Sequence, residues 1–193
     1  MKSVGQLGED GLIARICGDL GEAAHVIVGP GDDCAAVGTG EELVLLKTDA
    51  VVAGVHFLSD EKSTRVGWKA VARVLSDFAA MGGEPGELLI TLALAPEVSV
   101  DWVDGLYRGM NSCLKQHGGV IVGGETTSLP EGTPTMVSVA GKGRVARANL
   151  VTRSSGRPGD DIYVTGRLGG SIHGKHLDFT PRLREAAWLV NNS

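Results

Sequence analysis

Short apolar runs and two longer helical segments follow one another along this chain in an order that restricts the folds open to it. Apolar residues recur with a helical period across 66–81 and again beyond Asp101, which is expected to cap the second helix. Compact apolar runs predict five strands, at 25–28, 43–46, 88–94, 120–122 and 135–139. The resulting order, β-β-α-β-α-β-β, predicts an α+β fold in which helices pack on one face of a mixed sheet.

The two ends of the chain carry further signals. Residues 7–20 predict a short amphipathic helix that ends at Gly21. Arg, Ser, Gly and Pro are concentrated in 152–161, which indicates a linker, and a strand is expected at 162–165 and a helix from Arg182. We therefore expect a first domain over 1–150, with a linker and the beginning of an incomplete second domain over 151–193.

Charge and composition exclude several classes of function. The formal net charge of −5 argues against a nucleic-acid partner, which would need concentrated Lys and Arg. Apolar stretches stay well short of the roughly 20 residues that span a bilayer, and the start does not resemble a signal peptide. The cysteines, Cys17, Cys34 and Cys113, are odd in number and widely spaced, so neither a disulfide framework nor a zinc ribbon is expected. A reducing cytoplasm is the simplest setting.

Four acidic motifs follow or end apolar runs: Gly31-Asp32-Asp33, Lys47-Thr48-Asp49, Leu75-Ser76-Asp77 and Gly123-Gly124-Glu125. Each alone is typical of a turn or a helix cap. Together they offer oxygen donors without clustered thiols or imidazoles, which suits magnesium. The glycine patterns of P-loop and Rossmann sites are absent from the sequence, so phosphate binding is expected to run through the metal.

Several other candidates have structural alternatives of equal or greater weight. His56 lies among apolar neighbours, as a partly buried structural histidine does, and Tyr107 lies on the apolar face of its predicted helix. Arg153 is either a phosphate contact or a solvated linker residue. Asp77 is one turn from Arg73, so a surface ion pair would also explain it.

In combination, five motifs in order resemble the thiamine-monophosphate kinase family. They are Gly-Asp-Asp-Cys-Ala at 31–35, Thr-Asp-Ala-Val-Val-Ala-Gly-Val-His-Phe at 48–57, Leu-Ser-Asp-Phe-Ala-Ala-Met-Gly-Gly at 75–83, Gly-Gly-Glu-Thr-Thr at 123–127 and Thr-Arg-Ser-Ser-Gly-Arg-Pro-Gly-Asp at 152–160. The resemblance implies the N-terminal domain fold of aminoimidazole ribonucleotide synthetase, in a superfamily of typically dimeric, ATP-using enzymes. Selenophosphate synthetase, a relative in that superfamily, is a weaker match.

The resemblance also implies roles for particular residues. Asp33, Thr48, Asp49 and Asp77 would bind magnesium, and His56 would contact thiamine monophosphate. ATP would be contacted at four positions: Tyr107, Gly124, Glu125 and Arg153. Two metal-site positions depart from the family, because Lys47 replaces a small hydroxyl residue and Glu125 replaces aspartate.

The implied reaction moves the γ-phosphoryl group of ATP onto thiamine monophosphate and forms thiamine diphosphate and ADP. Catalysis would consist of positioning and electrostatics, with no catalytic protein nucleophile. The N-terminal domain over 1–150 would bind ATP and metal and would form a homodimer. Full activity is expected to need a second domain, of which 174–182 match the beginning. The alternatives are a non-catalytic module for metal-nucleotide binding and dimerisation, or an enzyme of the superfamily acting on another small phosphate ester.

Overall fold

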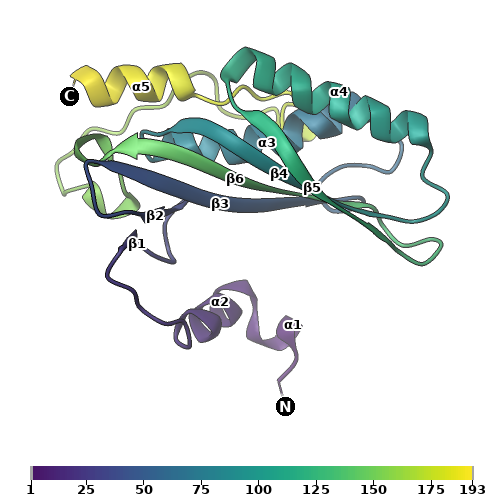
Figure 1. The fold of residues 1–193 in the computed structure, drawn as a ribbon, viewed down its shortest axis with the longest axis horizontal. Helices are drawn as coiled ribbons and strands as arrows, with labels where there is room; N and C mark the ends of the chain where they lie inside the picture. The colour runs from purple at the N-terminus through teal and green to yellow at the C-terminus, as the bar shows by residue number, and fades with distance from the viewer. Residues whose placement is uncertain (1, 193) are drawn as a thin grey trace.

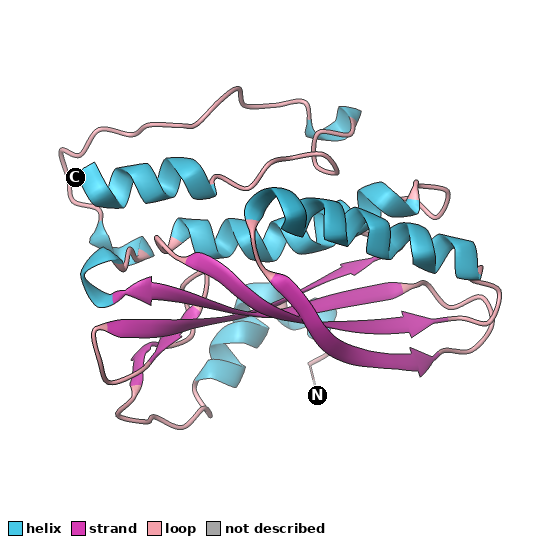
Figure 2. Cartoon of the chain, turned by 45° about the horizontal axis from the view of Figure 1, so that its top comes forward, coloured by secondary structure: helices cyan, strands magenta, loops and turns pink. Residues whose placement is uncertain are grey.

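A six-stranded sheet carrying two long helices on one face forms the body of the computed structural model, which describes residues 2–192 (Figures 1 and 2). The strands are β1 (Val26–Val28), β2 (Ala35–Val37), β3 (Glu42–Val52), β4 (Glu84–Leu94), β5 (Val120–Ser128) and β6 (Met136–Ala146). They lie in the order β1-β2-β3-β6-β4-β5, and only β4 and β5 pair in parallel. The predicted mixed sheet with helices on one face is confirmed.

Helices α3 (Ser63–Ala80) and α4 (Val100–His117) cover this face and close the hydrophobic core. Phe78 is fully buried and lies over β6, where a Cβ on Gly141 would fall 2.9 Å from its ring. The two helices cross so closely that a Cβ on Gly67 would fall 2.0 Å from the carbonyl oxygen of Leu106. Because Gly67 and Gly141 have no side chain, α3 can pack closely against both α4 and the sheet.

The opposite face of the sheet stays open. Leu46, Leu89 and Val122 from three different strands are 45%, 50% and 57% exposed there. These side chains line a groove of about 490 Å³ that Thr48 and Lys142 also border. The alternation of side chains along a strand explains both faces, because neighbours of the buried residues must point the other way.

Several predicted boundaries are wrong. Strand β3 is 11 residues long, so Lys47-Thr48-Asp49 lies inside it and not at its end, and Glu125 likewise lies inside β5. The short strand β2 was missed. Ser99, and not Asp101, caps α4, with its side-chain oxygen accepting a hydrogen bond from the backbone of Trp102. The polar residues within β3 and β5 hid the continuation of both strands.

The chain ends also differ from expectation. Two short helices, α1 (Val4–Leu7) and α2 (Glu9–Cys17), replace the single predicted helix, and neither buries a residue. The expected strand at 162–165 is absent, since Ile162 is 95% exposed and no neighbouring strand pairs with this described segment. Helix α5 (Leu183–Asn192) forms as predicted and contacts α3. None of the described helices is both long enough and apolar enough to cross a membrane.

Candidate functional site

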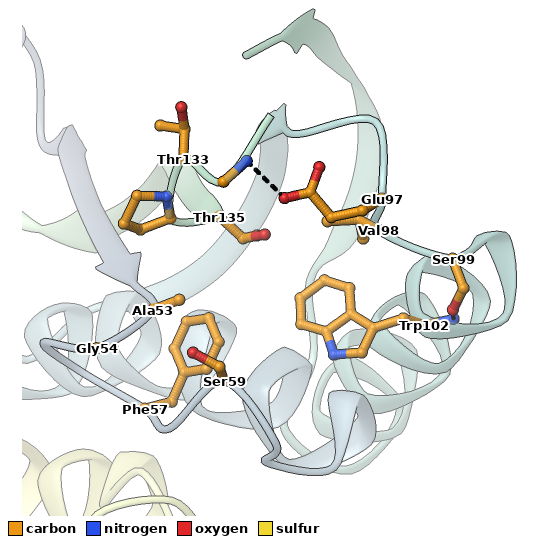
Figure 3. A pocket seen from close by; sticks show the side chains of 12 residues that line it. Ala53, Gly54, Phe57, Ser59, Glu97, Val98, Ser99, Trp102, Thr133 and Thr135 are labelled. Carbon is orange, nitrogen blue, oxygen red and sulfur yellow. Dashed lines mark hydrogen bonds between the residues drawn. The ribbon is translucent and has the colours of Figure 1, made fainter. Parts of the chain in front are cut away.

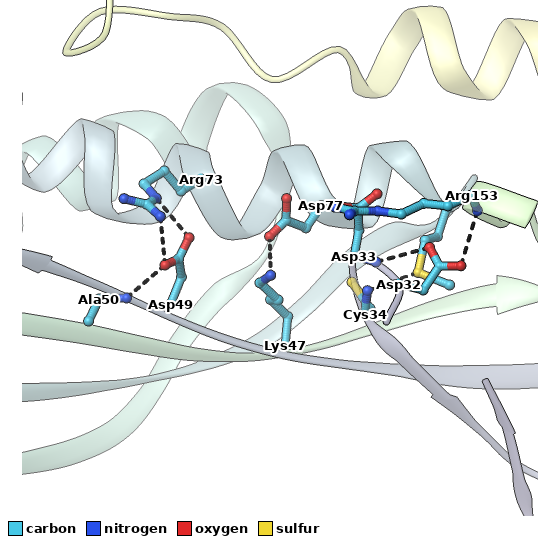
Figure 4. A network of polar contacts seen from close by, with 10 residues as sticks. Asp32, Asp33, Cys34, Lys47, Asp49, Ala50, Arg73, Asp77 and Arg153 are labelled. Carbon is cyan, nitrogen blue, oxygen red and sulfur yellow. Dashed lines mark hydrogen bonds and ion pairs between the residues drawn. The ribbon is translucent and has the colours of Figure 1, made fainter. Parts of the chain in front are cut away.

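Charged side chains fill the gap between β3 and α3 (Figure 4). Lys47 and Asp49 are two residues apart on β3, so both point toward the helix. Asp49 accepts two hydrogen bonds from Arg73 of α3, at 2.7 and 2.8 Å. One turn further along α3, Asp77 forms an ion pair with Lys47, with 2.7 Å between Oδ2 and Nζ. Each carboxylate in this gap is thus matched with a cation.

The loop before β2 brings two more carboxylates to the same line of charges. Asp33 forms an ion pair with Arg153, which sits in the 3-10 helix η2 (Arg153–Ser155). The backbone nitrogen of Arg153 donates to Asp32 at 3.1 Å. We call Asp32, Asp33, Asp49 and Asp77 the acidic row. Three of the four acidic motifs contribute to it, and Arg153 joins them although it is more than 100 residues away from Asp33.

Electrostatic repulsion is evident within the acidic row. Burial raises the pKa of Asp77 above its ordinary value, and the carboxylates of Asp33 and Asp49 raise it further, against the opposing effect of Lys47. Burial also raises the pKa of the neighbouring Cys34 thiol to about 12, so this thiol stays protonated at neutral pH. Carboxylates that repel one another in a partly buried gap are stabilised by added positive charge.

The donor chemistry of the acidic row therefore fits a hard divalent cation such as magnesium, which prefers carboxylate oxygens. In this structure Asp33, Asp49 and Asp77 are each paired with a basic side chain. Within residues 2–192, no group of three or more His, Cys, Asp or Glu side chains converges closely enough to hold a metal ion. Binding would require at least some of these ion pairs to open.

Other residues expected at the metal site lie elsewhere. The Thr48 hydroxyl is on the open face of the sheet, 3.5 Å from that of Ser138. Glu125 is in register with Thr91, which is in register with Ser138, so its side chain belongs to the open face as well. Three strand spacings, about 14 Å, separate β5 from β3. One chain therefore does not bring Thr48 or Glu125 side chains to Asp49.

The proposed ATP contacts are similarly divided. Arg153 lies beside Asp33, as the resemblance implies. Gly124 precedes Glu125 on the edge strand β5. Tyr107 is half-buried on α4 and packs against the hydrophobic core. Of these positions, only Arg153 joins the acidic row within the chain.

His56 lies in the loop that follows β3. Its Nδ1 accepts a hydrogen bond from the backbone nitrogen of Val52 at 3.1 Å. Burial, together with the cations of Arg73 and Lys69, lowers the pKa of His56 below its ordinary value. The loop is thus built around a neutral imidazole at neutral pH, because a protonated Nδ1 would be unable to accept this bond.

Two cavities flank the His56 loop. One, of about 360 Å³, which we call the basic cavity, is lined by His56, Arg65, His173 and His176, and by Glu61, which pairs with Arg65 at 2.8 Å. The other, of about 510 Å³, lies beside the stacked rings of Phe57 and Trp102 (Figure 3). Its only charged lining residue is Glu97, so it suits a phosphate poorly. The basic cavity is the better place for an anionic group, because Arg65 and three imidazoles outnumber its one carboxylate.

A row of charges along α3 was missed by the sequence analysis. Arg65, Lys69, Arg73 and Asp77 recur every four residues and so share one helix face. Lys69 is 7% exposed, and its Nζ contacts the carbonyl oxygen of His56 and, at 2.8 Å, the Nδ1 of His176. Burial and Arg73 lower the pKa of Lys69. The four-residue spacing was the available signal, but the apolar period of the same helix masked it.

The same helix face holds the segment that precedes α5. Arg65 donates to both carboxylate oxygens of Asp178, at 2.9 and 2.6 Å. The Trp68 indole donates to the carbonyl oxygen of Phe179 at 2.8 Å. Together with the contact between Lys69 and His176, these bonds fasten 176–179 to α3. The segment thereby completes one wall of the basic cavity.

Comparison with known proteins gives a consistent result. Residues 31–145 match the family described as AIR synthase related protein, N-terminal domain. The chain is 37% identical over 169 residues to thiamine-monophosphate kinase of Escherichia coli (strain K12), covering 86% of the chain and 50% of that protein. It is 34% identical over 190 residues to thiamine-monophosphate kinase of Rhodopirellula baltica, covering 94% of the chain and 59% of that protein.

A solved structure of AaThiL complexed with AMPPCP and TMP has a similar fold. The TM-score is 0.87 at 30% sequence identity, and the match covers 98% of this chain and 64% of that one. The chain thus spans between half and two thirds of the length of these relatives.

Proposed function

The chain belongs to the AIR synthase related family through its N-terminal domain, and from this we propose that it serves the ATP-dependent phosphorylation of thiamine monophosphate to thiamine diphosphate. The observation that carries the proposal is the acidic row beside Arg153, because phosphoryl transfer requires grouped anions to be held and neutralised. The choice of thiamine monophosphate as the substrate rests on the named relatives, which are thiamine-monophosphate kinases. The part of the relatives that the chain does not span is expected to be needed for full turnover.

In this proposal Asp33, Asp49 and Asp77 hold magnesium, which when bound would neutralise the phosphates of ATP. Arg73 and Arg153, released from their carboxylates, are available to bind phosphate oxygens, for which the planar guanidinium is well suited. His56, with Arg65 and His176 in the same cavity, supports binding of the phosphate of the acceptor. The work of these residues is to position and neutralise two anions.

Isothermal titration calorimetry of the 193-residue chain tests the proposal. AMPPCP is expected to bind only in the presence of magnesium. Thiamine monophosphate is then expected to bind to the chain with AMPPCP and magnesium. Thiamine, which lacks the phosphate, is the matched control ligand and is expected to bind more weakly. We expect little or no ADP release when ATP replaces AMPPCP. Absence of magnesium-dependent nucleotide binding would contradict the proposal. Nucleotide binding with preference for a different phosphate ester would favour another activity of the family.

We also propose that the chain forms a homodimer through the open face of its sheet. The exposed apolar side chains of Leu46, Leu89 and Val122 support this, because such patches usually mark an interface. Since Glu125 lies on the open face, on a strand three spacings from β3, we propose that Gly124 and Glu125 lie at this dimer interface and not at the acidic row of their own chain. The three cysteines are free, which agrees with a cytoplasmic location.

Replacing Leu89 with Asp should separate the dimer. The substitution places a charge in the middle of the apolar groove, where pairing would bury it without a partner. Sedimentation velocity is expected to show a dimer for the wild-type chain and a monomer for Leu89→Asp. Leu168→Asp is the matched control, because this leucine is 81% exposed in a loop away from the sheet and its replacement should leave the dimer intact. A monomeric wild-type chain would refute the proposal.

A further inference from the structure

Lys47 holds a central place in the acidic row. Figure 4 shows its ammonium between the pair of Asp49 with Arg73 on one side and Asp33 with Arg153 on the other. The ammonium lies 2.7 Å from the carboxylate of Asp77. Repulsion from Asp33 and Asp49 disfavours the charged form of this carboxylate and raises its pKa. The ammonium therefore contacts one carboxylate, that of Asp77, which has Asp49 on one side and Asp33 on the other.

Lys47 is also the least exposed of the three cations. Its side chain is 24% exposed, compared with 30% for Arg73 and 65% for Arg153. Arg153 sits in a short 3-10 helix at the surface and can withdraw into solvent. Lys47 projects from β3, an internal strand, where its backbone is in register with Gly141 of β6. The Arg153 pair is therefore the easiest of the three to open, and Lys47 is the cation most protected from solvent.

The charges of the site are nearly balanced before any ligand arrives. Four carboxylates, from Asp32, Asp33, Asp49 and Asp77, face three cations, from Lys47, Arg73 and Arg153. If the two arginines turn to phosphate, Lys47 remains as one positive charge among the carboxylates. An ammonium is a compact point charge with three donors, so it can occupy the position of a small cation beside a carboxylate.

We propose that Lys47, paired with Oδ2 of Asp77, takes the place of a second divalent ion, next to the magnesium that Asp77 shares with Asp33 and Asp49. The chain consequently binds one divalent ion fewer than its carboxylates would otherwise support, or binds that ion much more weakly. Lys47 is thus a positioning residue that sets the metal content of the site. The inference rests on the proposed metal binding by the acidic row.

Counting bound Mn²⁺ by electron paramagnetic resonance tests this directly. Lys47→Ser removes the ammonium, and the variant is expected to gain one Mn²⁺ per chain, or to bind Mn²⁺ about tenfold more tightly or better. Lys47→Met keeps most of the stem without the charge and should behave similarly if Lys47→Ser folds poorly. Lys47→Arg retains the charge and should match the wild type. Folding of each variant is checked by circular dichroism.

Lys142→Ser is the matched control. Lys142 is on the neighbouring strand β6, borders the open face and pairs with Glu87, so its removal should leave Mn²⁺ binding unchanged. Equal Mn²⁺ number and affinity in the wild type, Lys47→Ser and Lys47→Met would overturn the inference while leaving the proposed function intact. Failure of all these proteins to bind Mn²⁺ would overturn both.

Discussion

Asp77→Asn is expected to abolish magnesium-dependent binding of AMPPCP. Asp77 lies at the centre of the acidic row, between Asp33 and Asp49, and its replacement removes a charged oxygen donor without changing its size. Mutating a residue that only hydrogen-bonds to a metal ligand typically lowers metal affinity by about 10- to 100-fold. Loss of a direct ligand should therefore weaken binding by at least about 100-fold. Calorimetry with and without magnesium measures the effect.

The control for this substitution is Asp104→Asn, on the exposed side of α4. It removes the same charge from the chain and should leave nucleotide binding unchanged. Asp77→Asn should fold normally, because burial already disfavours the charged carboxylate and asparagine has nearly the same shape. Unchanged affinity of a folded Asp77→Asn variant would show that the acidic row is not the metal site.

Gly67→Val is expected to disrupt the packing of α3 on α4. Even a Cβ at this position would lie 2.0 Å from the carbonyl oxygen of Leu106 and 3.0 Å from the backbone nitrogen of Met110, and backbone atoms have little room to move. Overpacking a core costs about 1–3 kcal/mol, and this clash with backbone should reach or exceed about 3 kcal/mol. The melting temperature should fall by at least about 6 °C.

Gly5→Val is the control for the added side chain. Gly5 is also helical, in α1, and a Cβ there meets nothing within 4 Å. This variant should unfold at the wild-type temperature, as measured by circular dichroism. Normal stability of Gly67→Val would mean that the two helices do not cross as closely as the structure shows.

The architecture could be predicted because apolar periods are local properties of the sequence. Segments 66–81 and 88–94 each carry a clear period, and both elements formed with shifted boundaries. Strand β3 was predicted too short because Lys47 and Asp49 interrupt its apolar run. Their charges are tolerated inside a strand only because Arg73 and Asp77 face them from α3. This compensation is tertiary and leaves no local trace.

The candidate site was only partly predictable for the same reason. Motif order correctly grouped Asp33, Asp49 and Asp77 as neighbours in space. The faces on which Thr48 and Glu125 lie depend on strand boundaries and register, which motif reading does not supply. The contacts of Lys69 with His56 and His176 join three separate parts of the chain, so spacing alone indicated at most that Lys69 shares a helix face with Arg73.

The strand order has a consequence for how the protein is made. β6 is the last of the six strands described within residues 2–192, yet it lies between β3 and β4 and is paired with both. During synthesis, the edges of β3 and β4 that pair with β6 therefore stay unpaired until about residue 146 has left the ribosome. Loop closure over such a long separation slows folding. Until then the nascent chain exposes unpaired strand edges on both sides of the gap, and this is the interval in which a chaperone has most to protect.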